Sequence, residues 1–391
     1  MSAARNSLTR LCAAGFVAYC SYSICRAPLL PLFARELGAS PSLIGFVVGA
    51  STITGVFLKL PAGALSDLLG RRRLLLAGAL VFAAMPFTYL GASTLGLLIA
   101  LRFVHGSATA IFGPVASASI SDIAPGERRG AWLSLYSTAQ GTGQAMGPVI
   151  AGYLIALGRY DLAFLCSGVI GIATPLIVAT WPVQPPTTAS RPTWQAFRRG
   201  VAEVASDRLV LITSVAHAAQ FVLNGALNAF LPLYGRDVLN LTASDLGWLF
   251  GLQTLTTLAV RPGIGFLSDR VGRRQVIVTG LTLCSLAVFA LSMTTDIAMV
   301  IVVIAAYAAG VAITTAATSA FITDITRRAR YGAAHGVFGT IYDIGDALGP
   351  IAAGVLVAWV GYARMFQVMA AVALMMGGVF AVGTRPKHGG A

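Results

Sequence analysis

The feature that most constrains this chain is a set of long stretches without a single charged side chain. Six of them cover residues 37–58, 74–101, 130–158, 162–190, 275–295 and 297–323. A helix needs about 20 residues to cross a hydrocarbon core of about 30 Å, and every stretch is at least that long. They lack the short alternating pattern of transmembrane β-strands. They therefore predict membrane-spanning α-helices.

The composition agrees with a polytopic membrane protein. Only 10% of the 391 residues are charged and 57% are apolar, whereas soluble domains carry about 25% charged residues. A soluble enzyme, a disordered chain and a nucleic-acid binder are all excluded. We predict an all-α membrane protein with twelve transmembrane helices, at 9–34, 41–66, 74–92, 95–122, 130–157, 161–181, 209–234, 243–267, 275–293, 297–324, 332–360 and 363–383.

The basic residues indicate how the chain is oriented. Of the 27 Lys and Arg residues, 19 fall on the side that holds both termini when the first span starts in the cytoplasm. Basic loops remain in the cytoplasm, so both termini are expected there. We expect a multi-pass protein of the cell membrane, namely a bacterial inner membrane. The net charge of +13 thus reports topology and not a nucleic-acid partner. The five cysteines show no spacing typical of disulfides or metal sites, and we expect no metal.

The two halves of the chain repeat each other at an offset of 202 residues. Gly63-Ala-Leu-Ser-Asp67 corresponds to Gly265-Phe-Leu-Ser-Asp269, and Arg35-Glu36 corresponds to Arg236-Asp237 at nearly the same offset. We predict two pseudo-symmetric six-helix bundles, at 1–181 and 209–391. A cytoplasmic connector at 182–208, with an amphipathic helix at 194–204, would join them. Parallel repeats of this kind are typical of transporters that bind substrate between the two halves.

These motifs resemble a known family. Gly63-x-Leu-Ser-Asp67-x-x-Gly70-Arg71-Arg72 is similar to the signature between helices 2 and 3 of the major facilitator superfamily. Gly143-x-x-x-Gly147-Pro148-x-x-Ala151-Gly152 resembles the helix 5 element of its twelve-helix drug/proton antiporters. Arg102-Phe-Val-His105-Gly106 resembles the helix 4 element, with His in place of Gln. The resemblance covers the whole chain and implies the major facilitator fold with alternating access.

The signature loops provide a candidate conformational gate. Ion pairs at the cytoplasmic ends of neighbouring helices can lock one conformation and break in another, although anchoring of helix ends is the alternative interpretation. The resemblance implies that Asp67→Asn impairs transport without loss of expression. The candidate gate residues are Asp67, Arg71, Asp122, Asp269, Arg273 and Asp324.

Charged residues within the spans are candidates for coupling and binding. Asp343 and Asp346 lie near the middle of a predicted helix, three residues apart and so on one face. Mutual repulsion and poor solvation favour their protonated forms, so the pair could carry protons; a static ion pair with Arg26 is the alternative. Arg26 could equally bind an anionic substrate. The resemblance assigns Arg102 a part in proton coupling, unless it reaches up to the interface.

Other polar residues within the spans are candidates for a substrate cavity, or for hydrogen bonds between helices. His105 has the pattern of a hydrogen-bonded core histidine or of a proton carrier. The candidates are His105, Gln140, Gln144, His217, Gln220, Asn224 and Asn228. The small residues Gly143, Gly147 and Gly152, with Pro148, predict close helix packing and a bend.

We expect a secondary active transporter that exports a small organic compound or drug in exchange for protons. The alternative is a proton symporter that takes up an organic anion or a sugar, and a lesser one is a non-transporting receptor on the same scaffold. No phosphate-binding loop or hydrolase motif is present in the sequence, so we expect neither an enzyme nor a cofactor, with the proton gradient as the energy source. The expected partners are the substrate, protons and the lipid bilayer, with the protein a monomer.

Overall fold

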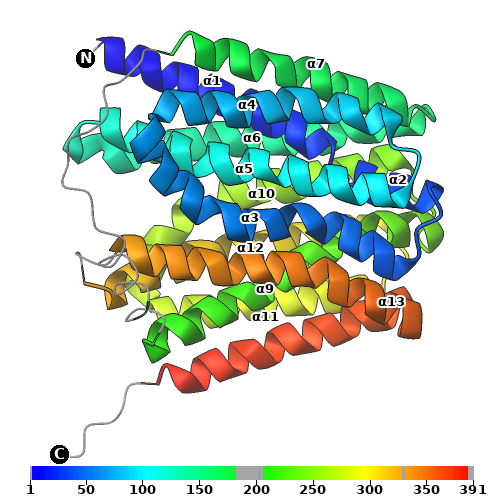
Figure 1. The fold of residues 1–391 in the computed structure, drawn as a ribbon. Helices are drawn as coiled ribbons and strands as arrows, with labels where there is room; N and C mark the ends of the chain where they lie inside the picture. The colour runs from blue at the N-terminus through cyan, green and yellow to red at the C-terminus, as the bar shows by residue number, and fades with distance from the viewer. Residues whose placement is uncertain (1, 182–201, 203–205, 328–330, 386–391) are drawn as a thin grey trace, which may run out of the picture. The chain divides into compact units, whose positions relative to one another are not determined.

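The structure is a computed structural model that describes residues 2–181, 202, 206–327 and 331–385. Helices make up nearly all of this part of the chain (Figure 1). The first half contains α1 Ser2–Ile24, α2 Leu29–Glu36, α3 Pro41–Leu69, α4 Arg71–Thr88, α5 Leu95–Ile123, α6 Arg129–Ala156 and α7 Tyr160–Ala179. The second half contains α9 Arg208–Asp237, α10 Ala243–Val271, α11 Arg273–Leu291, α12 Ile297–Ile325 and α13 Tyr331–Gly383.

The helices have the length needed to cross a bilayer. Among the described residues, nine are long and apolar enough by length and composition, and α1 with α2 forms one of these spans. Helices α6 and α10 are as long as the others, with 28 and 29 residues. Helix α13 covers two predicted spans. The helices therefore agree with the twelve predicted crossings. Most of the predicted connector, including 194–204, lies outside the described residues.

Local sequence explains where several helices begin. The side-chain oxygens of Ser40, Thr94 and Asp296 accept hydrogen bonds from the backbone N–H three residues later, at the starts of α3, α5 and α12. These N-caps satisfy backbone donors that have no partner within the helix. Gly70 and Gly272 take positive φ angles of 91° and 100° between α3 and α4 and between α10 and α11. A residue with a side chain adopts this conformation only under strain.

The first predicted span is not one continuous helix. Helix α1 ends at Ile24 and α2 begins at Leu29, after Pro28. The backbone N–H of Arg26 donates to the carbonyl of Ser23 (3.1 Å), and the N–H of Leu30 donates to the carbonyl of Arg26 (2.7 Å). Pro28 has no N–H to continue the helix, so the chain turns there within the membrane. Irregular backbone at this depth is tolerated only where protein or a cavity surrounds it.

The last two predicted spans are joined without a loop. Helix α13 runs over 53 residues, and its helical backbone is interrupted at Gly361, where φ is 78° and ψ is 174°. Glycine reaches this conformation without the clash of a side chain. One residue therefore forms the corner between residues 331–360 and 362–383.

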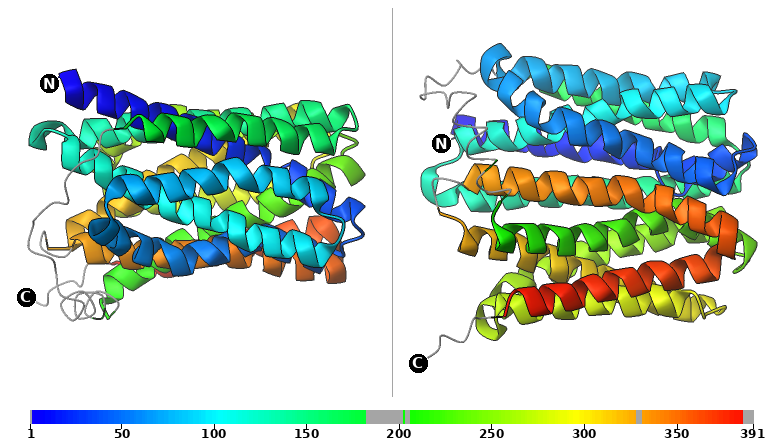
Figure 2. Two further views of the ribbon diagram at one scale, coloured as in Figure 1. Left: turned by 45° about the horizontal axis from the view of Figure 1, so that its top comes forward. Right: turned by 60° about the horizontal axis from the view of Figure 1, so that its bottom comes forward.

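The helices cluster into two compact units. Unit 1 is the described part of Met1–Thr188 with Ala226–Leu255 and Pro350–Ala358, and unit 2 is the described part of Ala189–Gly225 with Thr256–Gly349 and Trp359–Ala391. In unit 1, α1 packs against α6 and α7, and α5 packs against α3 and α4 (Figures 1 and 2). Its core includes Phe82, Phe112 and Trp181. In unit 2, α11 packs along α12, and Ile277, Leu281 and Phe380 are fully buried.

The sequence repeat appears again in the contacts inside each unit. In unit 1, the guanidinium of Arg72 donates to the carbonyl of Ala179 at the end of α7. In unit 2, Arg274 donates in the same way to the carbonyl of Ala381 at the end of α13. Both partners are shifted by 202 residues. A basic side chain thus caps the C-terminal carbonyls of a helix at equivalent places, where a cation is favoured.

Candidate functional site

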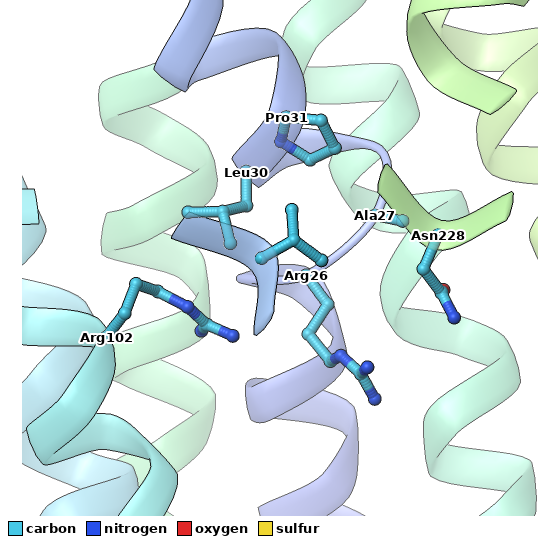
Figure 3. A pocket seen from close by; sticks show the side chains of 7 residues that line it. Arg26, Ala27, Leu30, Pro31, Arg102 and Asn228 are labelled. Atoms are coloured by element: carbon cyan, nitrogen blue, oxygen red, sulfur yellow. The ribbon is translucent and has the colours of Figure 1, made fainter. Parts of the chain in front are cut away.

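A pocket lies in unit 1 where the first span is broken (Figure 3). It encloses about 180 Å³ of space between atoms, yet in this conformation it is too narrow for a water molecule. Its walls come from the break between α1 and α2, and from α3, α5 and α9. The lining residues are Arg26, Ala27, Leu30, Pro31, Val48, Arg102 and Asn228.

Arg102 is the most deeply buried charge of this pocket. Its side chain on α5 is fully buried. One terminal nitrogen, Nη2, donates to the hydroxyl of Ser51, and the guanidinium carbon lies 6.0 Å from the centre of the Tyr22 ring. Its Nε and Nη1 have no hydrogen-bond acceptor among the described residues. Since an arginine at the membrane centre costs about 2.5–3.5 kcal/mol on insertion scales, a cation held in this way needs a functional reason.

Arg26 lines the same pocket from the break after α1. It is half-buried, and its guanidinium carbon lies 5.8 Å from the centre of the Tyr22 ring. Both arginines therefore lie within cation–π distance of the Tyr22 ring. Asn228 of α9 contributes the amide of the lining. The pairing of Arg26 with the helix α13 aspartates stays a prediction.

His105 lies one turn after Arg102 and is fully buried. Its Nδ1 is 3.1 Å from the hydroxyl of Tyr89, and its ring meets Tyr22 edge-on at a centroid distance of 4.9 Å. This is the environment of a hydrogen-bonded core histidine. Its Nε2 has no hydrogen-bond partner in the described part of the chain.

The two aspartates of helix α13 lie in unit 2. Asp343 is 6% exposed, and Asp346 accepts a hydrogen bond from the side-chain amide of Asn224 on α9 (3.1 Å). Gly345 makes this approach possible, because a Cβ there would collide with the carbonyl of Ala218 on α9. Small residues let helix backbones approach closely in membranes. The structure thus brings Asp346 and Asn224 together. Sequence spacing alone did not predict this contact.

The remaining polar candidates occupy different surroundings. On α9, the Nδ1 of His217 is 3.3 Å from the hydroxyl of Thr318, and its ring stacks on Phe338 at 4.8 Å. Gln220 is fully buried, and neither its amide nitrogen nor its oxygen has a hydrogen-bond partner among the residues described. Gln140 and Gln144 are half-buried on α6. Within the described residues, no group of His, Cys, Asp or Glu is arranged to hold a metal ion.

The candidate gate residues form the same ion pair twice. The Nε of Arg71 lies 3.0 Å from a carboxylate oxygen of Asp122, and the Nε of Arg273 lies 2.9 Å from one of Asp324. Both arginines also donate to a serine of the signature, Ser66 or Ser268. Arg273 contacts Asp269 as well, at 2.5 Å. The side chain of Asp67 lies outside the described residues.

The glycines of α6 lie against other backbones. A Cβ at Gly143 would collide with the carbonyl of Phe16 on α1, and one at Gly147 with Ser23 on the same helix. At Gly152 it would collide with the carbonyl of Ala243 at the start of α10. Pro148 is buried in the same helix, and its carbonyl faces Gly247 of α10.

Sequence reasoning missed several residues that shape these sites. Tyr22, Ser51 and Tyr89 surround Arg102, and none of them stands out in the sequence. Arg35 and Asp237 form an ion pair of 2.5 Å at the ends of α2 and α9. The repeated Arg35-Glu36 and Arg236-Asp237 pairs were a usable signal for this contact, because each half supplies one partner.

Comparison with known proteins agrees with these features. The sequence model of the Major Facilitator Superfamily matches residues 11–245 and 209–391. An MFS-type transporter of Methanocaldococcus jannaschii is 27% identical over 361 residues, which are 90% of this chain and 91% of that protein. The multidrug resistance protein MdtH of Aeromonas salmonicida is 23% identical, covering 84% of this chain and 82% of its own length. The quinolone resistance protein NorA of Staphylococcus aureus is 24% identical, with 57% and 59% covered.

Solved structures share the fold at low sequence identity. A bacterial homologue of the human lysosomal transporter Spinster superposes with a TM-score of 0.81 at 16% identity, covering 97% of this chain and 96% of the other. The nucleoside transporter NupG superposes with a TM-score of 0.80 at 14% identity, covering 98% and 100%. With the family match over both halves, the repeated signature turns and the all-helical architecture, this multi-pass membrane protein belongs to the major facilitator superfamily of transporters.

Proposed function

We propose that this protein is a secondary active transporter that exports a small organic compound from the cell in exchange for protons. The observation that carries the proposal is the presence in helix α13 of two aspartates three residues apart, Asp343, which is buried, and Asp346, which is half-buried. A carboxyl group within a membrane span is costly when ionised, so it readily exists in a protonated form. Similarity to the multidrug resistance protein MdtH and the quinolone resistance protein NorA supports export as the direction of transport.

The surroundings of the pair suit a group that changes its protonation state. Asn224 donates to Asp346 and thereby stabilises the carboxylate. Asp343, three residues earlier and almost fully buried, disfavours a second negative charge close by. Protons would therefore be taken up and released by the pair as a coupled unit. No cofactor is needed in this scheme, and the proton gradient supplies the energy.

Inverted membrane vesicles with an imposed proton gradient test the proposal. The probes are norfloxacin, a quinolone, and the dye ethidium, and both should accumulate in vesicles that contain the wild-type protein. The variant Asp343→Asn/Asp346→Asn should lose gradient-driven accumulation and keep the exchange of labelled for unlabelled probe. Asp161→Asn, at an exposed ion pair with Arg159, is the matched control and should behave like wild type. Gradient-driven accumulation that persists in the double variant would refute the proposal.

Uptake of an organic anion together with protons is the second candidate, and the Arg26–Arg102 pocket favours it. The same vesicles decide between the two directions. An exporter concentrates its substrate when the vesicle interior is acidic, whereas a symporter releases it under that gradient. We place the protein in the cytoplasmic membrane with both termini inside, because its basic loops require that orientation.

A further inference from the structure

The pocket at the broken first span has an incomplete set of charges. Arg102 is fully buried and leaves two N–H groups, on Nε and Nη1, without an acceptor in the described part of the chain. The groups around it are a serine hydroxyl, two tyrosines and a histidine. No carboxylate of a described residue forms an ion pair with Arg102. Buried charges are normally paired, so the missing partner is an anion.

The donors face the space that needs filling. Figure 3 shows the guanidinium of Arg102 pointing from α5 toward Leu30 and Arg26. Arg26 lines the same space. Coulomb attraction between a carboxylate and the buried guanidinium of Arg102 is strong where water is excluded. The planar fork of a guanidinium also matches a carboxylate with two parallel hydrogen bonds.

The break in the first span also favours an anionic ligand in this pocket. Helix α2 begins at Leu29, and its N-cap residue Pro28 provides no side-chain hydrogen bond. The neighbouring residues Ala27, Leu30 and Pro31 line the pocket. The N-terminus of a helix carries a partial positive charge that attracts anions. The N–H of Leu30 is already bonded to the carbonyl of Arg26 and Pro31 has no N–H. The preference for an anion therefore rests on the two unsatisfied donors of Arg102, and the partial charge of α2 only adds to it.

The rest of the lining sets the size and polarity of the ligand. Leu30, Pro31 and Val48 are apolar, and Asn228 supplies a single amide. In this conformation the space is too narrow for a water molecule, so a ligand would enter only after the lining side chains move apart. We propose that this pocket binds the carboxylate of a small organic anion with an apolar body, and that Arg102 is its principal ligand. That the anion is also the transported substrate rests on the proposed function.

Binding can be measured on the purified protein without any transport. Three probes of nearly the same shape differ in charge: benzoate, benzamide and benzamidinium, with acetate/acetamide and octanoate/octanamide as further pairs. Thermal unfolding in detergent is followed at constant ionic strength, with sodium chloride and sodium phosphate as reference anions. We expect at least one carboxylate to raise Tm of the wild-type protein, and its amide and benzamidinium to leave Tm unchanged.

Variants assign the effect to the pocket. Arg102→Gln should lower the affinity for the stabilising carboxylate about tenfold or more, since a charge-assisted bidentate contact is lost. Arg102→Lys keeps the charge and should retain part of the affinity. Arg159→Gln removes an exposed arginine of the same unit, which pairs with Asp161, and should bind like wild type. This series separates the pocket from general effects of positive charge.

The proposal is overturned if no carboxylate stabilises the wild-type protein more than its amide. It is also overturned if benzamidinium stabilises as well as benzoate, if phosphate or chloride reproduces the whole effect, or if Arg102→Gln leaves the carboxylate shift intact. The comparison of carboxylates with their amides and with benzamidinium uses only the wild-type protein, so it tests the proposal even if a variant fails to fold. Carboxylate binding without gradient-driven flux would refute the proposed transport and leave the site standing. Gradient-driven flux of ethidium without carboxylate binding would support the proposed transport and refute the carboxylate site.

Discussion

At the scale of single residues, glycine decides how closely the helices of unit 1 approach one another. Gly143 of α6 lies so near to α1 that the first atom of a side chain would overlap the carbonyl of Phe16. Gly96 in the first turn of α5 has open space around it, with no other heavy atom within 4 Å of an added Cβ. The same chemical change therefore has opposite consequences at these two positions.

We expect Gly143→Ala to destabilise the protein by about 1–3 kcal/mol, the usual cost of overpacking. Gly96→Ala should be neutral or stabilising by up to about 1 kcal/mol, because alanine favours the helix. Thermal unfolding of both variants in detergent checks this pair. Equal Tm values for the two variants would show that α1 and α6 do not approach as closely as described.

The residues of the pocket could be predicted only in part. Arg26 and Arg102 stand out because charges are rare in apolar spans, and the structure places both at one pocket. Ser51 and Tyr22 could not be found in this way. Serine and tyrosine are common in membrane helices, and their role depends on which helices become neighbours. Burial of Arg102 likewise follows from packing and not from its distance to the end of α5.

At the scale of elements, one structural motif occurs twice, in the turn between α3 and α4 and in the turn between α10 and α11. A glycine with positive φ reverses the chain, and the next arginine reaches the aspartate at the end of the helix two further on. In each case the arginine also binds a serine of the preceding helix. Three helix ends are thereby held together at each turn.

We expect Asp122→Asn to reduce the transport rate by up to about fivefold, since a partly exposed ion pair is worth about 0–1 kcal/mol. Loss of the pair should shift the balance between conformations and leave Tm almost unchanged. The initial rate of norfloxacin accumulation in inverted vesicles measures this effect. Asp161→Asn removes another exposed ion pair and should have no effect. A wild-type rate in Asp122→Asn would show that its pair only anchors helix ends.

Helix positions were largely predictable, because a charge-free stretch of about 20 residues has few alternatives to a membrane helix. Apart from the start of the first helix, predicted and observed span ends differ by at most four residues. The break at Pro28 was not predicted. The boundary at Gly361 was, between spans ending at 360 and beginning at 363, but not that a single residue would form it. Proline occurs inside other helices here, for example at Pro86 and Pro114, so its presence does not decide whether a helix stops.

At the scale of the whole molecule, an ion pair within unit 1 joins the two halves of the sequence. Arg35 at the end of α2 and Asp237 at the end of α9 lie 2.5 Å apart, and about a third of each side chain is exposed. Arg236 is the counterpart of Arg35, and Asp237 that of Glu36, at an offset of 201 residues. The internal duplication thus supplies both partners of the contact.

Charge reversal should reveal the role of this contact. We expect Asp237→Arg to slow transport, because two cations at the ends of α2 and α9 repel each other and disfavour the observed conformation. Arg35→Asp/Asp237→Arg restores opposite charges and should recover at least about half of the lost rate. Rates in inverted vesicles at low and high salt measure this, since salt screens exposed charges. A double variant no faster than the single one would refute the coupling.

The corner at Gly361 has a mechanical consequence for the end of the chain. Most helices here are followed by several residues that can absorb a tilt, whereas residues 331–360 pass into 362–383 through one residue. Without a loop between them, a rotation of one helical part is transmitted directly to the other. The final helix, 362–383, must therefore follow any movement of the preceding helical part, 331–360, which carries Asp343 and Asp346.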